Sequence, residues 1–204
     1  MSNTEKKTKK FNTRLIAGCG MLSAIAFVLQ LLEFPLPMLI PDFIKFDFSD
    51  LPELIGAFAY GPVAGIVIAI VKNLLHALIA THSFGVGELC NCILGAAFAG
   101  VAGLVYKKKK TKKRAALGGV LGAASMAVIS FPFNLFVVYP FYYNFMPKDV
   151  IIKAYHTILP FVNSIEVSLL VFNVPFTLVK GLICVGITML IYQPLRPILK
   201  GKTE

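Results

Sequence analysis

Long apolar runs, separated by short polar or proline-rich segments, dominate this chain, and their spacing predicts six membrane-spanning helices. The runs lie at about 15–34, 50–60, 63–81, 86–106, 115–143 and 163–192. A helix needs roughly 20 apolar residues to cross about 30 Å of hydrocarbon, and every run except the second has about that length. The sequence does not show the polar–apolar alternation that is typical of membrane β-barrel strands. The predicted fold class is therefore an all-α membrane protein.

Prolines mark the breaks and the candidate bends in this pattern. Three prolines within residues 35–41 cannot continue a helix, so residues 35–49 are predicted to form a structured outer loop. Pro132 and Pro140 are candidate bends in the fifth span. The predicted division is a single transmembrane domain at 15–195 between tails at 1–14 and 196–204.

Positive charge is concentrated in three blocks, and this predicts the orientation. The net charge is +10, and 15 of the 20 Lys and Arg residues lie in the N-terminal tail, the loop 107–114 and the C-terminal tail. Lys and Arg are enriched on the cytoplasmic side of membrane proteins, and the helix count places all three blocks on one face. Both termini and loop 107–114 are therefore predicted to be cytoplasmic, where they could also hold anionic lipid headgroups. No RNA- or DNA-binding motif accompanies the blocks, which argues against a nucleic-acid partner.

Composition supports the membrane class. Hydrophobic residues make up 57% of the chain and charged residues only 15%, against about 25% charged residues in soluble domains. The four cysteines, at 19, 90, 92 and 184, all lie in apolar runs. Such cysteines are interpreted as small apolar packing residues.

Polar residues inside the apolar runs are the candidate chemistry. A charged group at the bilayer centre costs roughly 2.5–3.5 kcal/mol and normally faces the bundle interior or a cavity. A Lys72–Glu88 ion pair could simply tie two helices together, but polar groups spread over four spans favour a ligand pocket. His76 has no second His or Cys at i+3 or i+4, so no metal site is expected. The candidate binding residues are Asn73, Glu88, Asn91, Asn134, Thr177 and Lys180.

An aromatic segment and two stripes of small residues each allow two interpretations. The aromatic segment 132–143 is either an interfacial belt or a stacking wall for a flat ring. Gly20 and Ala24 in the first span form a small-xxx-small pair, and residues 95, 99 and 103 repeat that spacing in the fourth. Such stripes let helices approach closely, either within the chain or against a helix of another subunit.

Enzymatic activity finds little support in the motifs. Gly201-Lys202-Thr203 lacks the earlier glycine of a phosphate-binding loop, because Arg196 stands at that position. Any ATP hydrolysis would therefore belong to another subunit. Candidate serines show no sequence-local base, so we assign no catalytic residue. An intramembrane enzyme using Lys72, His76 and Glu88 remains the alternative from another class, together with a purely structural scaffold.

Several motifs resemble one transporter family. They are Lys45-Phe46-Asp47-Phe48-Ser49-Asp50-Leu51-Pro52, Ile55-Gly56-Ala57-Phe58, Gly61-Pro62, Lys72-Asn73-Leu74-Leu75-His76, Gly85-Val86-Gly87-Glu88-Leu89 with Asn91, and Pro175-Phe176-Thr177-Leu178-Val179-Lys180-Gly181. Together they resemble the riboflavin-binding S components of energy-coupling factor (ECF) transporters, over roughly residues 15–195. Thr177 stands where the family motif usually has asparagine.

The resemblance implies a specific function. The chain would be a six-helix, multi-pass protein of a bacterial cell membrane that captures riboflavin as a transported ligand and needs no cofactor. The outer loop would close over the ligand. The Gly20/Ala24 face would dock onto a transmembrane coupling subunit carried by two ATP-binding cassette ATPases, and the S component would topple in the bilayer to release the vitamin inward. An S component for another vitamin or precursor is the alternative within the family.

Overall fold

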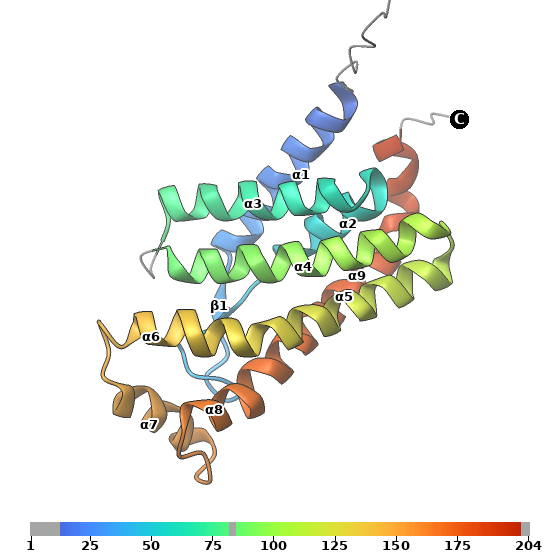
Figure 1. The fold of residues 1–204 in the computed structure, drawn as a ribbon. Helices are drawn as coiled ribbons and strands as arrows, with labels where there is room; N and C mark the ends of the chain where they lie inside the picture. The colour runs from blue at the N-terminus through green and yellow to red at the C-terminus, as the bar shows by residue number, and fades with distance from the viewer. Residues whose placement is uncertain (1–12, 82–84, 201–204) are drawn as a thin grey trace, which may run out of the picture.

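The computed structural model describes residues 13–81 and 85–200, so the basic residues before position 13 and the Gly-Lys-Thr triplet at 201–203 lie outside the described residues. Figure 1 shows a bundle of helices with a small two-stranded ribbon. In chain order the elements are α1 (Thr13–Leu31), β1 (Phe34–Pro35), β2 (Lys45–Phe46), α2 (Asp50–Tyr60), α3 (Pro62–Ile79), α4 (Val86–Lys108), α5 (Lys112–Phe133), a π-helical turn η1 (Asn134–Val138), α6 (Tyr139–Tyr142), α7 (Lys148–Ile158), α8 (Ile165–Ser168), a second π-helical turn η2 (Leu169–Asn173) and α9 (Val174–Lys200).

The structure confirms the helical membrane class. Within the described residues, five helical segments are long and apolar enough to cross a bilayer, namely Thr13–Leu31, Pro62–Ile79, Val86–Lys108, Lys112–Tyr142 and Ile165–Tyr192. The predicted second span forms α2 at the expected bounds, but its 11 residues give a helix of only about 16 Å at 1.5 Å per residue. The count of six spans therefore stays a prediction.

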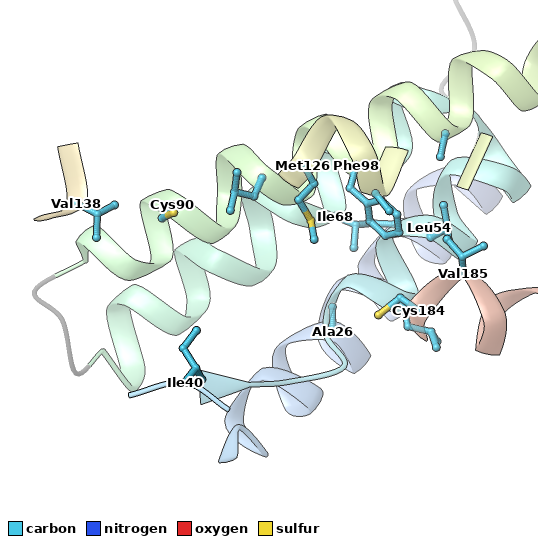
Figure 2. Packing of buried hydrophobic residues seen from close by; sticks show 14 of the residues in the cluster. Ala26, Ile40, Leu54, Ile68, Cys90, Phe98, Met126, Val138, Cys184 and Val185 are labelled. Atoms are coloured by element: carbon cyan, nitrogen blue, oxygen red, sulfur yellow. The ribbon is translucent and has the colours of Figure 1, made fainter. Parts of the chain in front are cut away.

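Helix α2 lies in the middle of the bundle, and every residue from Asp50 to Phe58 is buried. Figure 2 shows the side chains of Leu54, Ile68 and Phe98, from α2, α3 and α4, lying close together in the apolar core. All three are at most 2% exposed in the chain. A short buried helix needs no solvent-facing polar side, and its two acidic residues, Asp50 and Glu53, are paired with buried lysines instead.

Small residues bring the helices into close contact. A Cβ atom at Gly118 of α5 would lie 2.7 Å from the carbonyl oxygen of Ala102 in α4, and one at Gly65 of α3 would lie 2.7 Å from Cβ of Ala99. Ala99 belongs to the small-residue stripe of the fourth span. In this structure that stripe packs within the chain, which decides between the two readings left open by the sequence.

The helices extend beyond the apolar runs at the basic loop. Helix α4 continues to Lys108 and α5 begins at Lys112, so the turn inside the predicted loop 107–114 is short. Lysine is a good helix former, and Thr111 caps α5 by accepting a hydrogen bond from the backbone N–H of Arg114 at 3.3 Å. Figure 1 shows this turn at the same end of the bundle as the start of α1 and the end of α9.

The opposite end carries the irregular elements. Strands β1 and β2 pair antiparallel, with Phe34 opposite Phe46 and Pro35 opposite Lys45, so the predicted outer loop is a hairpin-like excursion. One residue separates Pro132 from the start of η1, and one residue separates the end of η2 from Pro175. A π-helical turn spaces its hydrogen bonds one residue wider than an α-helix does and often occurs at functional sites.

Candidate functional site

A cavity of ≈ 420 Å³ lies at the end of the bundle that carries the outer hairpin, α6 and α7. Its volume falls in the range of small-molecule pockets. Its polar lining consists of Gln30, Glu33, Lys45, Asp50, His76, Glu88, Asn91, Asn134, Asn173, Thr177 and Lys180, and its aromatic lining of Phe43, Tyr139, Phe141, Tyr142, Phe145 and Phe176. This mixture of flat apolar walls and a few polar groups suits a ligand with a ring system and several hydrogen-bonding groups.

Five of the six candidate binding residues line this cavity, and they come from three helical segments. Glu88 and Asn91 lie on α4, Asn134 opens η1, and Thr177 and Lys180 lie on α9. The sixth, Asn73, is 3% exposed and lies outside the lining. Its side chain donates to the carbonyl oxygen of Ala69 at 2.9 Å.

Gln30 at the end of α1 is a lining residue that the sequence reasoning missed. Its Nε2 donates to Oδ1 of Asn73 at 3.1 Å, so Asn73 acts on the cavity through Gln30. Among the described residues, the buried Oε1 of Gln30 has no hydrogen-bond partner. A buried acceptor without a donor costs about 1–3 kcal/mol, which makes this oxygen a natural acceptor for a ligand N–H or O–H.

His76 and Glu88 form a buried pair on the same wall. Nδ1 of His76 lies 2.9 Å from Oε1 of Glu88, and the imidazole ring meets Phe27 edge-on. The pair joins α3 to α4 across the gap between two apolar spans. It holds the Glu88 carboxylate in a defined orientation, with both residues still lining the cavity.

A buried charge cluster forms part of the floor. Nζ of Lys180 lies 2.9 Å from Asp47 Oδ2 and 3.2 Å from Asp50 Oδ2. Nζ of Lys72 lies 3.0 Å from Asp50 Oδ1 and 2.7 Å from Glu53 Oε1, and it also contacts the Ser49 hydroxyl. Three carboxylates thus face two ammonium groups, and Lys72 serves to tie α3 to α2 instead of reaching the ligand space.

The cluster also fixes the base of the outer hairpin. Asp47 directly follows β2, and its Oδ1 accepts from the backbone N–H of Ser49 at 2.7 Å. Its partner Lys180 lies 133 residues later in the chain. Since a lysine ammonium has three donors and two point at Asp47 and Asp50, the third remains for a group in the cavity that Lys180 lines.

A second hydrogen-bond network joins α6, α7 and η2. The hydroxyl groups of Tyr139 and Tyr155 are hydrogen-bonded to each other, Tyr155 donates to Asn173 Oδ1 at 2.7 Å, and Asn173 Nδ2 donates to the Tyr139 hydroxyl at 3.2 Å. Burial raises the pKa of Tyr155 well above its usual range, so its hydroxyl stays protonated as the donor. Asn173 lies one turn before Thr177, and both line the cavity.

Aromatic side chains connect the outer hairpin to the rest of the cavity wall. The ring of Phe43 meets Tyr142 and Tyr155 edge-on, with centroids 6.4 and 6.0 Å apart, and Phe46 meets Phe176 at 6.0 Å. Edge-to-face contacts of this kind each add about 0.5–1.5 kcal/mol beyond area burial. These aromatic contacts therefore hold the hairpin against the helices over the cavity.

The small-xxx-small pair of the first span has a different location. Gly20 and Ala24 are exposed on α1, and a Cβ atom at Gly20 would meet nothing within 4 Å. Neighbouring apolar residues on the same helix are also exposed, with Met21 at 50% and Ile25 at 45%. This face is free of the bundle and open to lipid or to another subunit.

Comparison with known proteins agrees with this architecture. The chain is 35% identical over 201 residues to the riboflavin transporter RibU of Staphylococcus aureus (strain TCH60), which covers 98% of this chain and 99% of that protein. It is 34% identical over 180 residues to the riboflavin transporter FmnP of Bacillus subtilis (strain 168), covering 87% and 90% respectively.

A solved structure, described as "Structure and mechanism of the S component of a bacterial ECF transporter", matches with a TM-score of 0.71 at 35% identity, covering 93% of this chain and 98% of that one. The family model for "ECF transporter, substrate-specific component" matches residues 14–192. These matches confirm the resemblance and the prediction of a transporter component instead of an enzyme. The chain belongs to the substrate-specific (S) components of ECF transporters.

Proposed function

We propose that this protein is the riboflavin-binding S component of an ECF uptake transporter. The observation that carries the proposal is the cavity beneath the outer hairpin, with its aromatic walls and convergent polar groups. Its relatives at 34–35% identity are named riboflavin transporters. Riboflavin combines a flat, largely apolar ring system with a polar edge and a chain of hydroxyls, and this matches the cavity lining in kind.

The polar groups that line the cavity would bind different parts of the ligand, according to whether they donate or accept hydrogen bonds. Lys180 and Thr177 on α9 provide donors for the carbonyl groups of the ring edge. Glu88, Asn91 and Asn134 provide acceptors and amides for hydroxyls. In the same proposal the Oε1 atom of Gln30 takes one further ligand donor.

The proposed transport role extends this binding. The chain captures riboflavin from outside a bacterial cell, with both termini cytoplasmic and the outer loop over the site. The Gly20/Ala24 face docks onto a transmembrane coupling subunit, and two ATP-binding cassette ATPases supply the energy. The clustering of positive residues and the exposure of Gly20 support these assignments.

Binding of riboflavin is tested with the full chain purified in detergent after expression in a riboflavin-producing host. We expect a yellow protein whose visible absorption matches a flavin, and quenching of flavin fluorescence on titration of the ligand-free chain. Thiamin, biotin and folate serve as competitors. A colourless protein that does not quench riboflavin, or one that binds another of these vitamins more tightly, would contradict the proposal.

A further inference from the structure

A second cavity, of ≈ 330 Å³, lies at the opposite end of the bundle, beside the α4–α5 turn. Its floor is made of Tyr106, Ala115, Met189 and Tyr192, and its rim of residues 110–112. Three helices contribute to it, because α4, α5 and α9 converge at this end (Figure 1). None of these residues belongs to the vitamin site described above.

The floor is apolar and fixed in place. The rings of Tyr106 and Tyr192 stand edge-to-face with centroids 6.2 Å apart, and both pack against Phe58. The Tyr192 hydroxyl donates to the carbonyl oxygen of Phe58 at 3.0 Å. Tyr106 and Tyr192 are only 4% and 6% exposed, so the cavity keeps its shape without a ligand.

The rim is strongly cationic. Lys110 and Lys112 are exposed beside the floor, and seven of the eight residues in 107–114 are Lys or Arg, with no acidic residue among them. The N-terminus of α5 begins at the same point, where the helix dipole adds positive potential. A pocket with an apolar floor and a cationic rim matches an amphipathic anion.

We propose that this cavity binds the headgroup of an anionic phospholipid, with its phosphodiester at Lys110 and Lys112. Basic pockets between helices at a membrane surface bind anionic headgroups in this way.

A free phosphate would use the lysines but not the apolar floor, whereas the glycerol backbone and first acyl carbons of a lipid could pack against that floor. The lipid is therefore the occupant that uses every part of the site. Each lysine near an anionic surface contributes about fivefold in affinity, so removing both is expected to weaken lipid binding at least tenfold.

The test measures retention of phosphatidylglycerol by the full chain in a neutral detergent, by native mass spectrometry. The variant Lys110→Gln/Lys112→Gln is compared with Lys109→Gln/Lys113→Gln, which removes the same charge from the same turn but leaves the cavity lining intact. We expect at least tenfold weaker retention in the first and less than a twofold change in the second. Gel filtration and circular dichroism establish that both variants are folded.

Three outcomes would overturn the proposal. Equal losses in the two variants would assign the effect to diffuse charge in the turn. Retention of phosphatidylcholine as strong as that of phosphatidylglycerol would remove the headgroup specificity. Displacement of the lipid by millimolar inorganic phosphate, at constant ionic strength, would reduce the site to a simple anion site.

Discussion

Replacing Lys180 with methionine tests the double role that the structure gives this side chain. The change keeps an unbranched apolar stem as far as Cε but removes the ammonium group from between Asp47 and Asp50, which lie 2.9 and 3.2 Å away. All three residues are at most 7% exposed. Asp47 would keep the backbone N–H of Ser49 as a donor, but it would lose its ion pair with Lys180.

The expected cost in stability is large. Removing one partner of a buried ion pair costs about 3–5 kcal/mol, because the other charge stays desolvated. For a chain of this size 1 kcal/mol shifts the unfolding midpoint by about 2–4 °C, so the midpoint in detergent should fall by about 6–20 °C. Loss of the remaining donor toward the cavity should also weaken riboflavin binding by about tenfold to a hundredfold.

The double variant Lys180→Met/Asp47→Asn separates the two roles. It removes the orphaned charge, so it should recover at least half of the lost stability, while riboflavin affinity should stay as weak as in Lys180→Met. Asp47→Asn alone is the control for effects on the hairpin. If the double variant regained full affinity, Lys180 would act only by holding the charge cluster together, and our assignment of its third donor to the ligand would be refuted.

Four further predictions follow from the site and the surface. Asn91→Ala should weaken riboflavin binding by about tenfold to a hundredfold through a lost buried hydrogen bond, as measured by fluorescence quenching. Gln30→Leu should weaken it by a similar factor and should also lower thermal stability, because the buried Oδ1 of Asn73 loses the donor Nε2 of Gln30; unchanged affinity would exclude Gln30 from the site. Gly20→Leu and Ala24→Leu should leave binding intact but block cellular uptake, since bulk on this face holds a partner helix away; normal uptake by both would remove the docking role. A cysteine at Thr111 should resist impermeant thiol reagents in intact cells, and ready labelling from outside would reverse the topology.

The sequence predicted much of the site because the bilayer makes polar residues conspicuous. Glu88, Asn91, Asn134 and Lys180 each interrupt an apolar run, and all of them line the cavity. Gln30 is also a polar residue in an apolar run, but it lies near the end of that run. A polar residue there is expected simply because the chain leaves the hydrocarbon. Polar residues in the middle of a span were therefore recognised as candidates, whereas a polar residue at the end of a span was missed.

Other features could not follow from periodicity. The two π-helical turns, η1 and η2, space their hydrogen bonds one residue wider than an α-helix does, and a 3.6-residue hydrophobic period carries no signal for them. The pairing of Asp47 with Lys180 spans 133 residues and depends on tertiary packing alone. Asn73 is the opposite case. The sequence predicted it as a binding residue, but in the structure Gln30 lines the cavity and Asn73 only accepts a hydrogen bond from Gln30.

The packing beyond the cavity under the outer hairpin constrains how the proposed ligand could leave toward the opposite end of the bundle. A Cβ atom at Gly122 would lie 2.6 Å from the carbonyl oxygen of Phe98, and one at Gly181 would lie 2.8 Å from Cβ of Ala123. Here α4, α5 and α9 touch so closely that even a methyl group is excluded, and interiors of this density do not deform continuously. A flat ring system could pass here only if these helices separated and gave up these close contacts. Reorientation of the whole bundle in the bilayer would keep those contacts, and the proposed docking of a coupling subunit on the exposed Gly20 face would not disturb them. The packing thus favours delivery by movement of the intact S component over passage through it.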